Sequence, residues 1–314
     1  MTAKTFFNFV RLKTLPVGLM PILVGLLFAK YYFNQFNILR SFLLIIGLIS
    51  INFFVSAWNN LMDYKKAVDI EYREKQNILS THKIPEKLAW KICFVLLAID
   101  IVIGIILTFM TNLMLLPIGG ICFIVAIFYT YGPFAFSRFP LGEILACLAE
   151  GLGSFFIAVY INSYQFNYFN VSFEGFKFNI VGDLKIILSL VLVGLFCGLM
   201  NFNVMLADNI SDLNQDIKNE RYTLPSYLGI PRSLNLFKLV YLVAFFLAIF
   251  AVILKILPVT TLLLVIALPL IYQNTNHFLK KQSKQETFKY SIQNLQLFEG
   301  AVILALAVEL VIHL

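Results

Sequence analysis

Charged residues are scarce in this chain: they make up only 13% of its 314 residues, whereas hydrophobic residues make up 60%. With so little charge and a mean hydropathy of +0.85, the chain lacks the polar groups that would cover a folded domain in water. The composition therefore excludes a water-soluble globule and predicts a protein that crosses a membrane several times.

Cysteine is also rare, with four residues and no Cys-X-X-Cys pair. All four lie inside apolar runs, which excludes a disulfide framework and a zinc site as the basis of the fold. We expect packing roles for Cys93, Cys122, Cys147 and Cys197. The net charge of +7 does not indicate a nucleic-acid partner, because the cations lie in short segments between apolar runs, where membrane lipids and topology account for them.

Apolar stretches of about 20 residues, the length that a helix needs to cross the hydrocarbon layer, recur along the whole chain. The nine stretches lie at residues 15–33, 41–60, 89–109, 114–131, 141–162, 184–205, 234–255, 257–273 and 296–313. The amino-terminal segment lacks the order of a cleaved signal peptide, so we expect the first stretch to be the first span. The sequence predicts an all-α membrane protein, a single domain over 1–314 with nine transmembrane helices.

The distribution of lysine and arginine predicts the orientation in the membrane. When the loops are counted alternately from an inner amino terminus, 19 of the 24 cations fall on the inner side. The other five are Lys30, Arg40, Lys177, Lys185 and Lys255. Because inner loops are enriched in cations, we expect a plasma or inner membrane protein with a cytoplasmic amino terminus.

Two acidic segments follow the second and sixth spans, both on the predicted inner side. "NNLMD" at 59–63 and "DNISD" at 208–212 align without a gap, which sets Asn60 over Asn209 and Asp63 over Asp212. The two segments are four helices apart. We interpret them as an internal pseudo-repeat of two halves, with motifs at 59–69 and 208–216, that places similar polar helix ends on opposite walls of one bundle.

The spacing within each segment aligns oxygen-bearing side chains on one helix face. Asp208, Asp212 and Asp216 are spaced i, i+4 and i+8, and Asn59 and Asp63 are spaced i, i+4. Asp69 lies six residues beyond Asp63 and breaks the pattern. We expect the helix to end near "KKAV" and the chain to turn this carboxylate back toward the others.

Five carboxylates so close together need cations or a metal to stay ionised. Oxygen ligands favour magnesium, which commonly joins one or two carboxylates to a substrate phosphate. Cations that could bind the phosphate lie close to the two segments in the sequence: Lys65, Lys66, Arg73, Lys75, Lys218 and Arg221. The alternative is a solvated helix end in the headgroup zone. Two segments with matched spacing favour a diphosphate site at the cytoplasmic face.

"NNLMDYKKAVD" and "DNISDLNQD" resemble the two Asp-rich motifs of the UbiA-type intramembrane prenyltransferases. That family has nine transmembrane helices around a central cavity. Three further segments, "RLKTLPVGLMPILVG", "YTYGPFAFSRFPLGE" and "DIKNERYTLPSYLG", are similar to the branch that acts on 1,4-dihydroxy-2-naphthoate in menaquinone synthesis. The resemblance covers most of the chain.

The resemblance implies a magnesium-dependent transfer of a polyprenyl group from polyprenyl diphosphate to dihydroxynaphthoate, with loss of diphosphate and CO2. It implies magnesium ligands at Asn59, Asp63, Asp69, Asp208, Asp212 and Asp216. It also implies that Lys13, Lys75, Asn209, Lys218 and Arg221 hold the diphosphate. The main catalytic roles fall to Asp63, Asp208, Asp212, Lys218 and Arg221. "EYREKQNILSTHKIPEK" departs from the family after the first motif, so Lys75 stands in for the usual phosphate contact.

The acceptor side has weaker candidates. Residues that we expect to meet the acceptor or stabilise a carbocation are Tyr129, Tyr131, Arg138, Glu143 and Glu150. Glu143 and Glu150 are seven residues apart and are predicted to share a helix face. Ionisable groups deep in a span are functional by default, but interfacial anchoring of the tyrosines and structural hydrogen bonding of the acids remain alternatives. For Asp100 we favour a structural role.

Two other functions fit the pattern. In the first alternative, a prenyltransferase of the same type uses another phenol, such as 4-hydroxybenzoate, as the acceptor. In the second, the protein is a transporter or lipid carrier that binds a diphosphate but forms and breaks no covalent bond. A carrier would bind the ligand without releasing pyrophosphate, which is the observation that separates it from a transferase.

Overall fold

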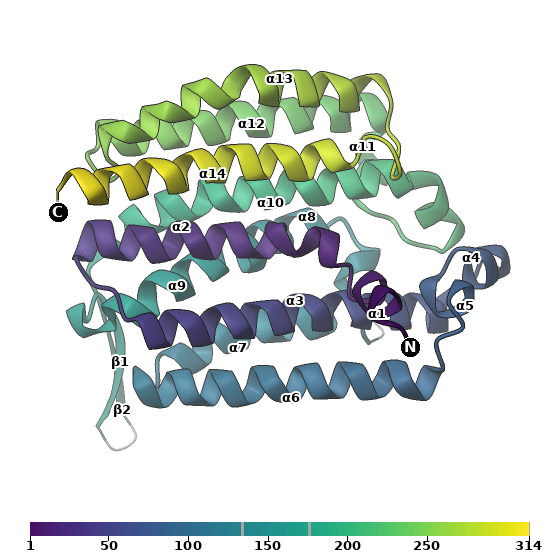
Figure 1. Cartoon of the computed structure of the whole chain (residues 1–314), viewed down its shortest axis with the longest axis horizontal. Helices are drawn as coiled ribbons and strands as arrows, with labels where there is room; N and C mark the ends of the chain where they lie inside the picture. The colour runs from purple at the N-terminus through teal and green to yellow at the C-terminus, as the bar shows by residue number, and fades with distance from the viewer. Residues whose placement is uncertain (133–134, 175–176, 314) are drawn as a thin grey trace.

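Long helices lying side by side form the body of the protein, and short helices and a hairpin close its two ends (Figure 1). The computed structural model describes residues 1–132, 135–174 and 177–313. The long helices are α2 (Leu15–Phe33), α3 (Ile38–Lys66), α6 (Glu86–Met110), α10 (Leu184–Lys218), α12 (Ile230–Ile253), α13 (Leu264–Lys280) and α14 (Lys289–Ile312). The shorter ones are α1 (Ala3–Phe9), α4 (Ile70–Lys75), α5 (Ile78–Thr81), α7 (Leu115–Phe128), α8 (Gly142–Leu145), α9 (Ser154–Ser163) and α11 (Leu224–Leu228).

Tighter or wider helical turns connect several of these helices. They are η1 (Leu12–Thr14), η2 (Phe136–Arg138), the π-helical η3 (Ala146–Gly153), η4 (Tyr164–Phe166) and η5 (Val259–Leu263). The hairpin consists of β1 (Phe169–Glu174) and β2 (Lys177–Gly182), which pair antiparallel with Phe169 opposite Gly182. It lies in the segment that the sequence places on the outer side.

The prediction of a helical membrane protein is confirmed. Eight helical segments of the described chain are long and apolar enough to cross a membrane, and α7 is a shorter apolar helix. The predicted span at 114–131 is therefore only 14 residues of helix. It ends at Phe128, and the chain then turns through Gly132, whose φ of +90° is a conformation that favours glycine.

The helices α3 and α10 extend the bundle beyond the expected spans at one end. Helix α3 continues to Lys66 and α10 continues to Lys218, so both acidic segments are helical continuations of membrane spans. Ala67, in an extended conformation, ends α3 near "KKAV", as predicted. Both helices end at one end of the molecule. The same end carries α1, α4, α5, α11 and the α13–α14 connection (Figure 1).

Small residues allow α10 to cross η3 at very short range. A Cβ atom on Gly151 would lie 2.3 Å from the Gly198 Cα, and one on Gly198 would lie 2.6 Å from the backbone oxygen of Cys147. Only glycine fits at such a crossing, as is common where helices pack within membranes. This contact fixes the π-helical segment against the helix that carries the second acidic segment.

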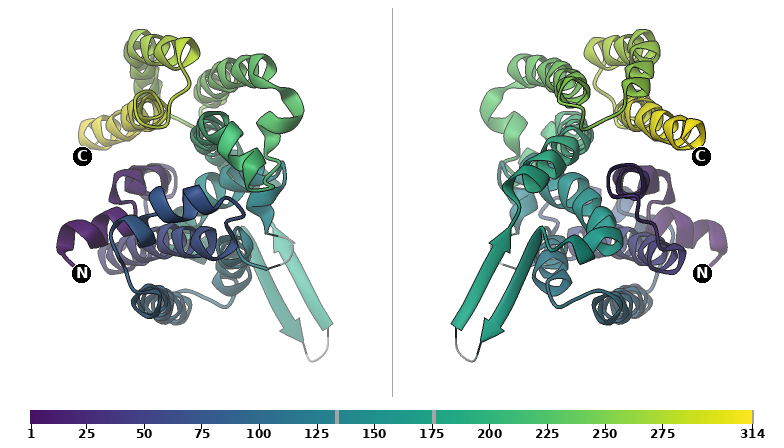
Figure 2. Two further views of the ribbon diagram at one scale, coloured as in Figure 1. Left: turned by 90° about the vertical axis from the view of Figure 1, so that its right-hand side faces the viewer. Right: turned by 90° about the vertical axis from the view of Figure 1, so that its left-hand side faces the viewer.

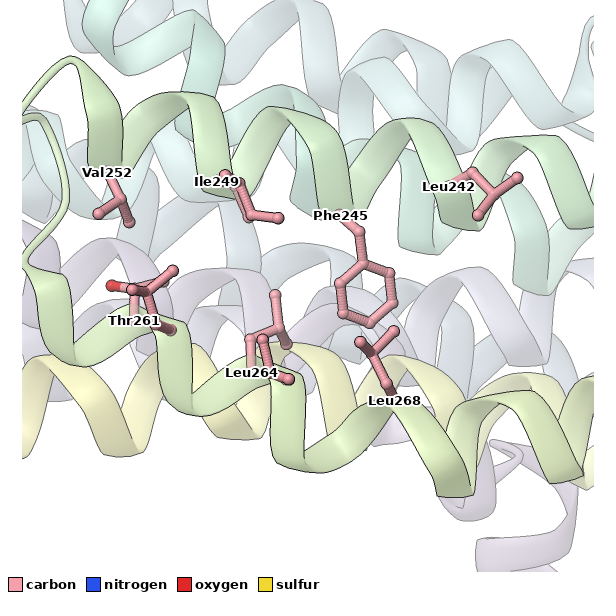
Figure 3. Close-up of a pocket in the computed structure, with 10 residues that line it drawn as sticks. Leu242, Phe245, Ile249, Val252, Thr261, Leu264 and Leu268 are labelled. Carbon is pink, nitrogen blue, oxygen red and sulfur yellow. The ribbon is translucent and has the colours of Figure 1, made fainter.

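The helices α12 and α13 form the edge of the bundle farthest from α6 (Figures 1 and 2). Between them lies a crevice of about 240 Å³ lined by Phe245, Leu264, Leu268 and other apolar side chains (Figure 3). Thr261 is its one polar lining residue among those described. A crevice of this composition suits contact with lipid tails and provides no groups for acid or base chemistry.

Candidate functional site

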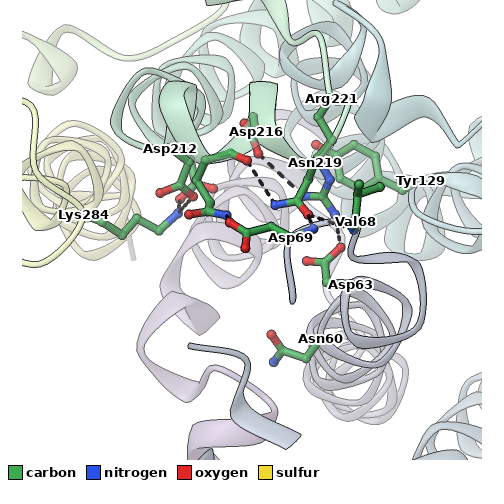
Figure 4. A network of polar contacts seen from close by, with 12 residues as sticks. Asn60, Asp63, Val68, Asp69, Tyr129, Asp212, Asp216, Asn219, Arg221 and Lys284 are labelled. Atoms are coloured by element: carbon green, nitrogen blue, oxygen red, sulfur yellow. Dashed lines mark hydrogen bonds and ion pairs between the residues drawn. The ribbon is translucent and has the colours of Figure 1, made fainter. Parts of the chain in front are cut away.

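The two acidic segments meet at the end of the bundle where α3 and α10 terminate (Figure 4). The guanidinium of Arg221, three residues beyond α10, donates a hydrogen bond to Oδ1 of Asp63 on α3. Nη1 of the same arginine lies 3.8 Å from Oδ1 of Asp216 on α10. The side chains of Asp63 and Asp216 are each only 10% exposed, so this cation compensates two largely buried carboxylates.

The chain turns back after α3, and Asp69 reaches across to α10. Its Oδ1 caps α4 by accepting hydrogen bonds from the Glu71 and Tyr72 amides, at 2.9 and 3.2 Å. Its Oδ2 accepts a hydrogen bond from Nε2 of Gln215 at 3.1 Å. The bond from Gln215, and then that from the Tyr72 amide, lowers the pKa of Asp69. Asp69 therefore links the first acidic segment to the second.

Asn219 strengthens this link. Its Oδ1 accepts hydrogen bonds from the amides of Val68 and Asp69, both at 3.2 Å. Its Nδ2 donates to the backbone oxygen of Gln215 at 3.1 Å. The sequence analysis missed Gln215 and Asn219, although both lie within or directly beside the second acidic segment.

A lysine from the other side of the bundle holds the outer part of the second segment. Nζ of Lys284, in the α13–α14 connection, donates hydrogen bonds to Oδ1 of Asp208 and to Oδ2 of Asp212, the latter at 2.7 Å. Burial disfavours the charged lysine, but the two carboxylates outweigh it and raise the pKa of Lys284. No sequence signal pointed to this residue, because only the fold brings the connection to α10.

Arg11 is a second cation that sequence reasoning missed. Its backbone is left-handed, with a φ of +49°, a strained conformation for a residue with a side chain. Its Nη2 donates to Oδ1 of Asn60 at 2.8 Å, and Nδ2 of Asn60 donates to the Phe9 oxygen at 2.8 Å. The strained turn thus directs a guanidinium toward the first acidic segment.

The remaining candidates for metal or diphosphate binding are placed unequally. Oδ1 of Asn59 accepts a hydrogen bond from Thr130 at 2.8 Å, and Nδ2 of Asn209 donates to Glu143 at 2.8 Å. Lys13 and Lys218 are exposed. Lys75 is exposed and paired with Glu71 on its own helix, at 3.1 Å, outside the network that joins the two segments.

A cavity of about 520 Å³ opens beside this network and runs between the helices. Arg11, Asn59 and Asp208 form a polar part of its lining. Most other lining residues are apolar and come from α3, α6 and α7, for example Leu48, Ile103 and Phe123. The cavity therefore combines an acidic and basic end with a long hydrocarbon wall, an arrangement suited to a lipid with a charged head.

Two acids deeper in the bundle also line this cavity. Glu150 lies in the π-helical η3, a type of turn that is frequent at functional sites. Asp100 of α6 lines the same cavity, and neither of its oxygens has a hydrogen-bond partner among the described residues. A structural role for Asp100, which the sequence favours, is therefore not supported by a hydrogen bond of its carboxylate within the described part of the chain.

The other acceptor candidates are separated by the fold. Glu143 is buried against Asn209, whereas Glu150 lines the cavity, because the intervening π-helical turns shift the register of a regular α-helix. Tyr129 also lines the cavity, and its hydroxyl donates to the Met205 sulfur at 3.2 Å. Tyr131 is exposed and packs against Trp58, with ring centroids 5.5 Å apart.

Arg138 is the remaining acceptor candidate. It lies in η2, and its backbone oxygen accepts a hydrogen bond from the Tyr222 amide at 3.1 Å. Neither Arg138 nor Tyr131 is among the residues that line the cavity. The neighbouring positions 133 and 134 of the "YTYGPFAFSRFPLGE" segment lie outside the described residues.

The donor set at the acidic ends fits a hard divalent cation. Among the described residues, no three histidine, cysteine or acidic side chains form a ready-made metal cluster. Instead Lys284 bridges Asp208 and Asp212, and Arg221 contacts Asp63, so cationic side chains compensate one oxygen of each of these carboxylates. Magnesium usually binds through one or two carboxylates plus substrate phosphates. The carboxylates of this site would therefore need a bound phosphate to complete the coordination of magnesium.

Known proteins share both the sequence pattern and the fold. The UbiA prenyltransferase family model matches residues 18–298. The chain is 22% identical over 233 residues to the 1,4-dihydroxy-2-naphthoate octaprenyltransferase of Bacillus subtilis (strain 168), which covers 74% of this chain and 68% of that protein.

Two solved structures have the same fold. A UbiA homolog from Aeropyrum pernix K1 in its apo form superposes with a TM-score of 0.71 at 16% identity, covering 93% of this chain and 98% of that chain. A UbiA homolog from Archaeoglobus fulgidus bound to GPP and Mg2+ superposes with a TM-score of 0.63 at 14% identity, covering 97% and 98%.

Proposed function

Because the chain belongs to the UbiA prenyltransferase family, we propose that this prenyltransferase transfers a polyprenyl group from polyprenyl diphosphate to 1,4-dihydroxy-2-naphthoate. The bond between the allylic carbon and the diphosphate oxygen breaks, and a bond forms to the ring carbon that carries the carboxylate. Diphosphate and CO2 leave. The observation that carries the proposal is the Arg221 contact with Asp63, which joins both acidic segments at one end of an apolar cavity.

The diphosphate group of the donor belongs at the acidic end. Asp63, Asp208 and Asp212 would hold magnesium there, with Asn59 and Asp216 from the same two helices and Asp69 from the cap of α4 as further oxygen donors. Magnesium bound at this position would neutralise the negative charge that grows on the diphosphate as the carbon–oxygen bond breaks. The relative from Bacillus subtilis supports the choice of acceptor, and the Archaeoglobus fulgidus structure supports the choice of metal.

Cationic side chains around the same end would stabilise the leaving group further. Arg221 is held in place by Asp63 and Asp216, and Arg11 is directed inward by its strained turn. A guanidinium presents a planar fork of donors that matches phosphate oxygens. Lys218, the last residue of α10, is exposed, and its flexible side chain would contact a bound diphosphate.

The cavity suits the rest of both substrates. Its apolar walls would hold the isoprenoid chain, whose carbon atoms gain from leaving water. Glu150 and Tyr129 are two of the polar residues that line the cavity. We assign Glu150 to the acceptor, where its carboxyl group would hydrogen bond a ring hydroxyl, and Tyr129 to the face of the allylic cation.

An acceptor comparison tests this function. The protein in nanodiscs is incubated with geranylgeranyl diphosphate, magnesium and either dihydroxynaphthoate or 4-hydroxybenzoate, and products are identified by mass spectrometry. The proposal predicts a prenylated naphthoquinol that has lost the mass of CO2. A product only with 4-hydroxybenzoate would keep the reaction class and replace the acceptor. Retained diphosphate binding with no product would support the carrier alternative.

A further inference from the structure

The α13–α14 connection, residues 281–288, crosses the end of α10 and carries Lys284 to the second acidic segment (Figures 1 and 4). Lys284 bonds both Asp208 and Asp212, which are one helical turn apart on the same face. The lysine side chain is 39% exposed, whereas those of Asp208 and Asp212 are 27% and 35% exposed. The contact is therefore partly open to solvent and to an incoming ligand.

The connection has a defined local structure. The Thr287 hydroxyl donates to the Lys281 oxygen at 2.7 Å and accepts a hydrogen bond from the Ser283 amide at 2.9 Å. Nζ of Lys284 also lies 5.0 Å from the ring centroid of Phe288, and Phe288 lines the cavity. The turn thus presents one side chain to the acidic pair and another to the substrate cavity.

Lys284 and a metal ion would compete for the carboxylates of Asp208 and Asp212. Two like charges one helical turn apart repel, and a cation between them relieves the repulsion. In this structure the lysine ammonium supplies that charge through one oxygen of each carboxylate. A divalent cation on the same two carboxylates would be repelled by the ammonium between them and would compete with it for their negative charge. Lysine is suited to giving them up, because its ammonium is a point charge on a flexible four-carbon stem.

We propose that Lys284 is a tethered counter-ion of Asp208 and Asp212, which yields these carboxylates to magnesium when a diphosphate binds and then contacts the diphosphate itself. This inference rests on the proposed function, because it concerns the same site. It makes metal binding conditional on the diphosphate: the free protein holds its own cation, and the metal enters together with a new partner for the lysine. Lys284 would then affect both the order in which diphosphate and metal bind and the affinity of the site for the diphosphate leaving group.

Manganese binding to the detergent-solubilised full chain tests the inference without any turnover. Mn2+ prefers the same oxygen ligands as magnesium and its free form is measured by electron paramagnetic resonance. The variants are Lys284→Gln, which removes the charge, and Lys284→Arg, which keeps it. Lys281→Gln is the matched control, because Lys281 lies in the same connection but pairs with exposed Glu286 at 2.6 Å.

Without diphosphate, we expect Lys284→Gln to bind Mn2+ about tenfold more tightly than the wild type, since loss of one nearby charge is worth about one decade. Lys284→Arg and Lys281→Gln should match the wild type. Equal Mn2+ affinity in Lys284→Gln and the wild type would overturn the inference, as would a failure of Lys284→Gln to bind Mn2+.

Addition of inorganic pyrophosphate gives a second readout, which compares the wild type with Lys284→Gln. It should increase the Mn2+ affinity of the wild type, and increase it less in Lys284→Gln, because the lysine is then free to contact the pyrophosphate. An equal increase in both proteins, or none in the wild type, would contradict the inference. Failure of the proposed function would show differently, as an absence of prenylated product from the wild type.

Discussion

The guanidinium of Arg221 donates a hydrogen bond to the carboxylate of Asp63, 158 positions away in the chain. This contact makes one site of two acidic segments that end different helices. Arg221 follows α10, Asp63 lies in the last turn and a half of α3, and Asp216 is the second carboxylate within reach of the arginine. We expect a diphosphate bound between the two helix ends to contact this arginine.

Replacement of Arg221 should therefore impair both catalysis and stability. We expect Arg221→Met to lower kcat/KM for the polyprenyl diphosphate about 100-fold or more, because a preorganised donor to the leaving group is lost. Arg221→Lys should recover only part of this loss, since an ammonium lacks the planar fork. Product formation is measured by mass spectrometry. Arg232→Lys, at an exposed position on α12, is the control and should leave activity unchanged.

Asp212→Asn tests the metal assignment of the second segment. The variant keeps the size of the side chain but removes a negative charge, so magnesium should bind more weakly. We expect the magnesium concentration for half-maximal activity to rise about tenfold. Glu71→Gln is the control, since Glu71 pairs with Lys75 at the surface. An unchanged magnesium requirement in Asp212→Asn would remove Asp212 from the metal ligands.

Glu150→Gln separates the acceptor from the donor. Glu150 lines the cavity from η3 and does not belong to either acidic helix end, so its loss should raise the KM for the aromatic acceptor by about tenfold and leave the KM for the prenyl diphosphate unchanged. Glu309→Gln is the matched control, because Glu309 lies in the span α14, accepts a hydrogen bond from Thr260 and does not line the cavity. Equal behaviour of the two variants would argue against an acceptor role for Glu150.

The glycine crossing predicts a stability effect without a change in chemistry. Gly151→Ala would place a methyl group against the backbone of Gly198 and push η3 away from α10. We expect a loss of about 1–3 kcal/mol, the usual range for overpacking, seen as a lower thermal unfolding temperature in detergent. Gly300→Ala should be tolerated, because a Cβ atom at this position would lie 3.6 Å from Cε of Met20, an ordinary van der Waals contact.

The Asp69 link has a predictable dependence on pH. Its folded-state pKa is lowered, so its contribution to stability is fully present above the unfolded value of about 3.9 and is lost as the pH falls through the folded value. Hydrogen exchange of the α4 amides at residues 70–75 should therefore show the same protection from pH 8 to pH 5, once corrected for intrinsic exchange rates. A loss of protection already near pH 6 would show that another group controls α4.

The sequence was sufficient to predict the spans, the shared end of the two acidic segments and the stop of α3 near Ala67, because hydropathy and helical spacing determine these features locally. It was not sufficient to identify Lys284 or Arg11. Lys284 reaches α10 only through the packing of α13 and α14 against the bundle, and Arg11 is directed inward by a left-handed backbone. Neither feature leaves a periodic signal.

The π-helical segment η3 could not be predicted from the sequence pattern either. An apolar run reads alike in α- and π-helical form, so the spacing of Glu143 and Glu150 suggested one face where the fold provides two different environments. The family pattern named both Asp63 and Arg221, and the fold brings these two side chains of opposite charge into contact. Their catalytic roles stay predictions.

The most direct test of the account is pyrophosphate release coupled to product formation in nanodiscs, with geranylgeranyl diphosphate, dihydroxynaphthoate and magnesium, in the wild type, Asp63→Ala and Asp208→Ala. One variant disables each acidic segment, and folding of both is checked by thermal unfolding. The account predicts equal amounts of pyrophosphate and prenylated naphthoquinol from the wild type and neither from the two variants. Full activity in either variant would contradict a single site built from both segments.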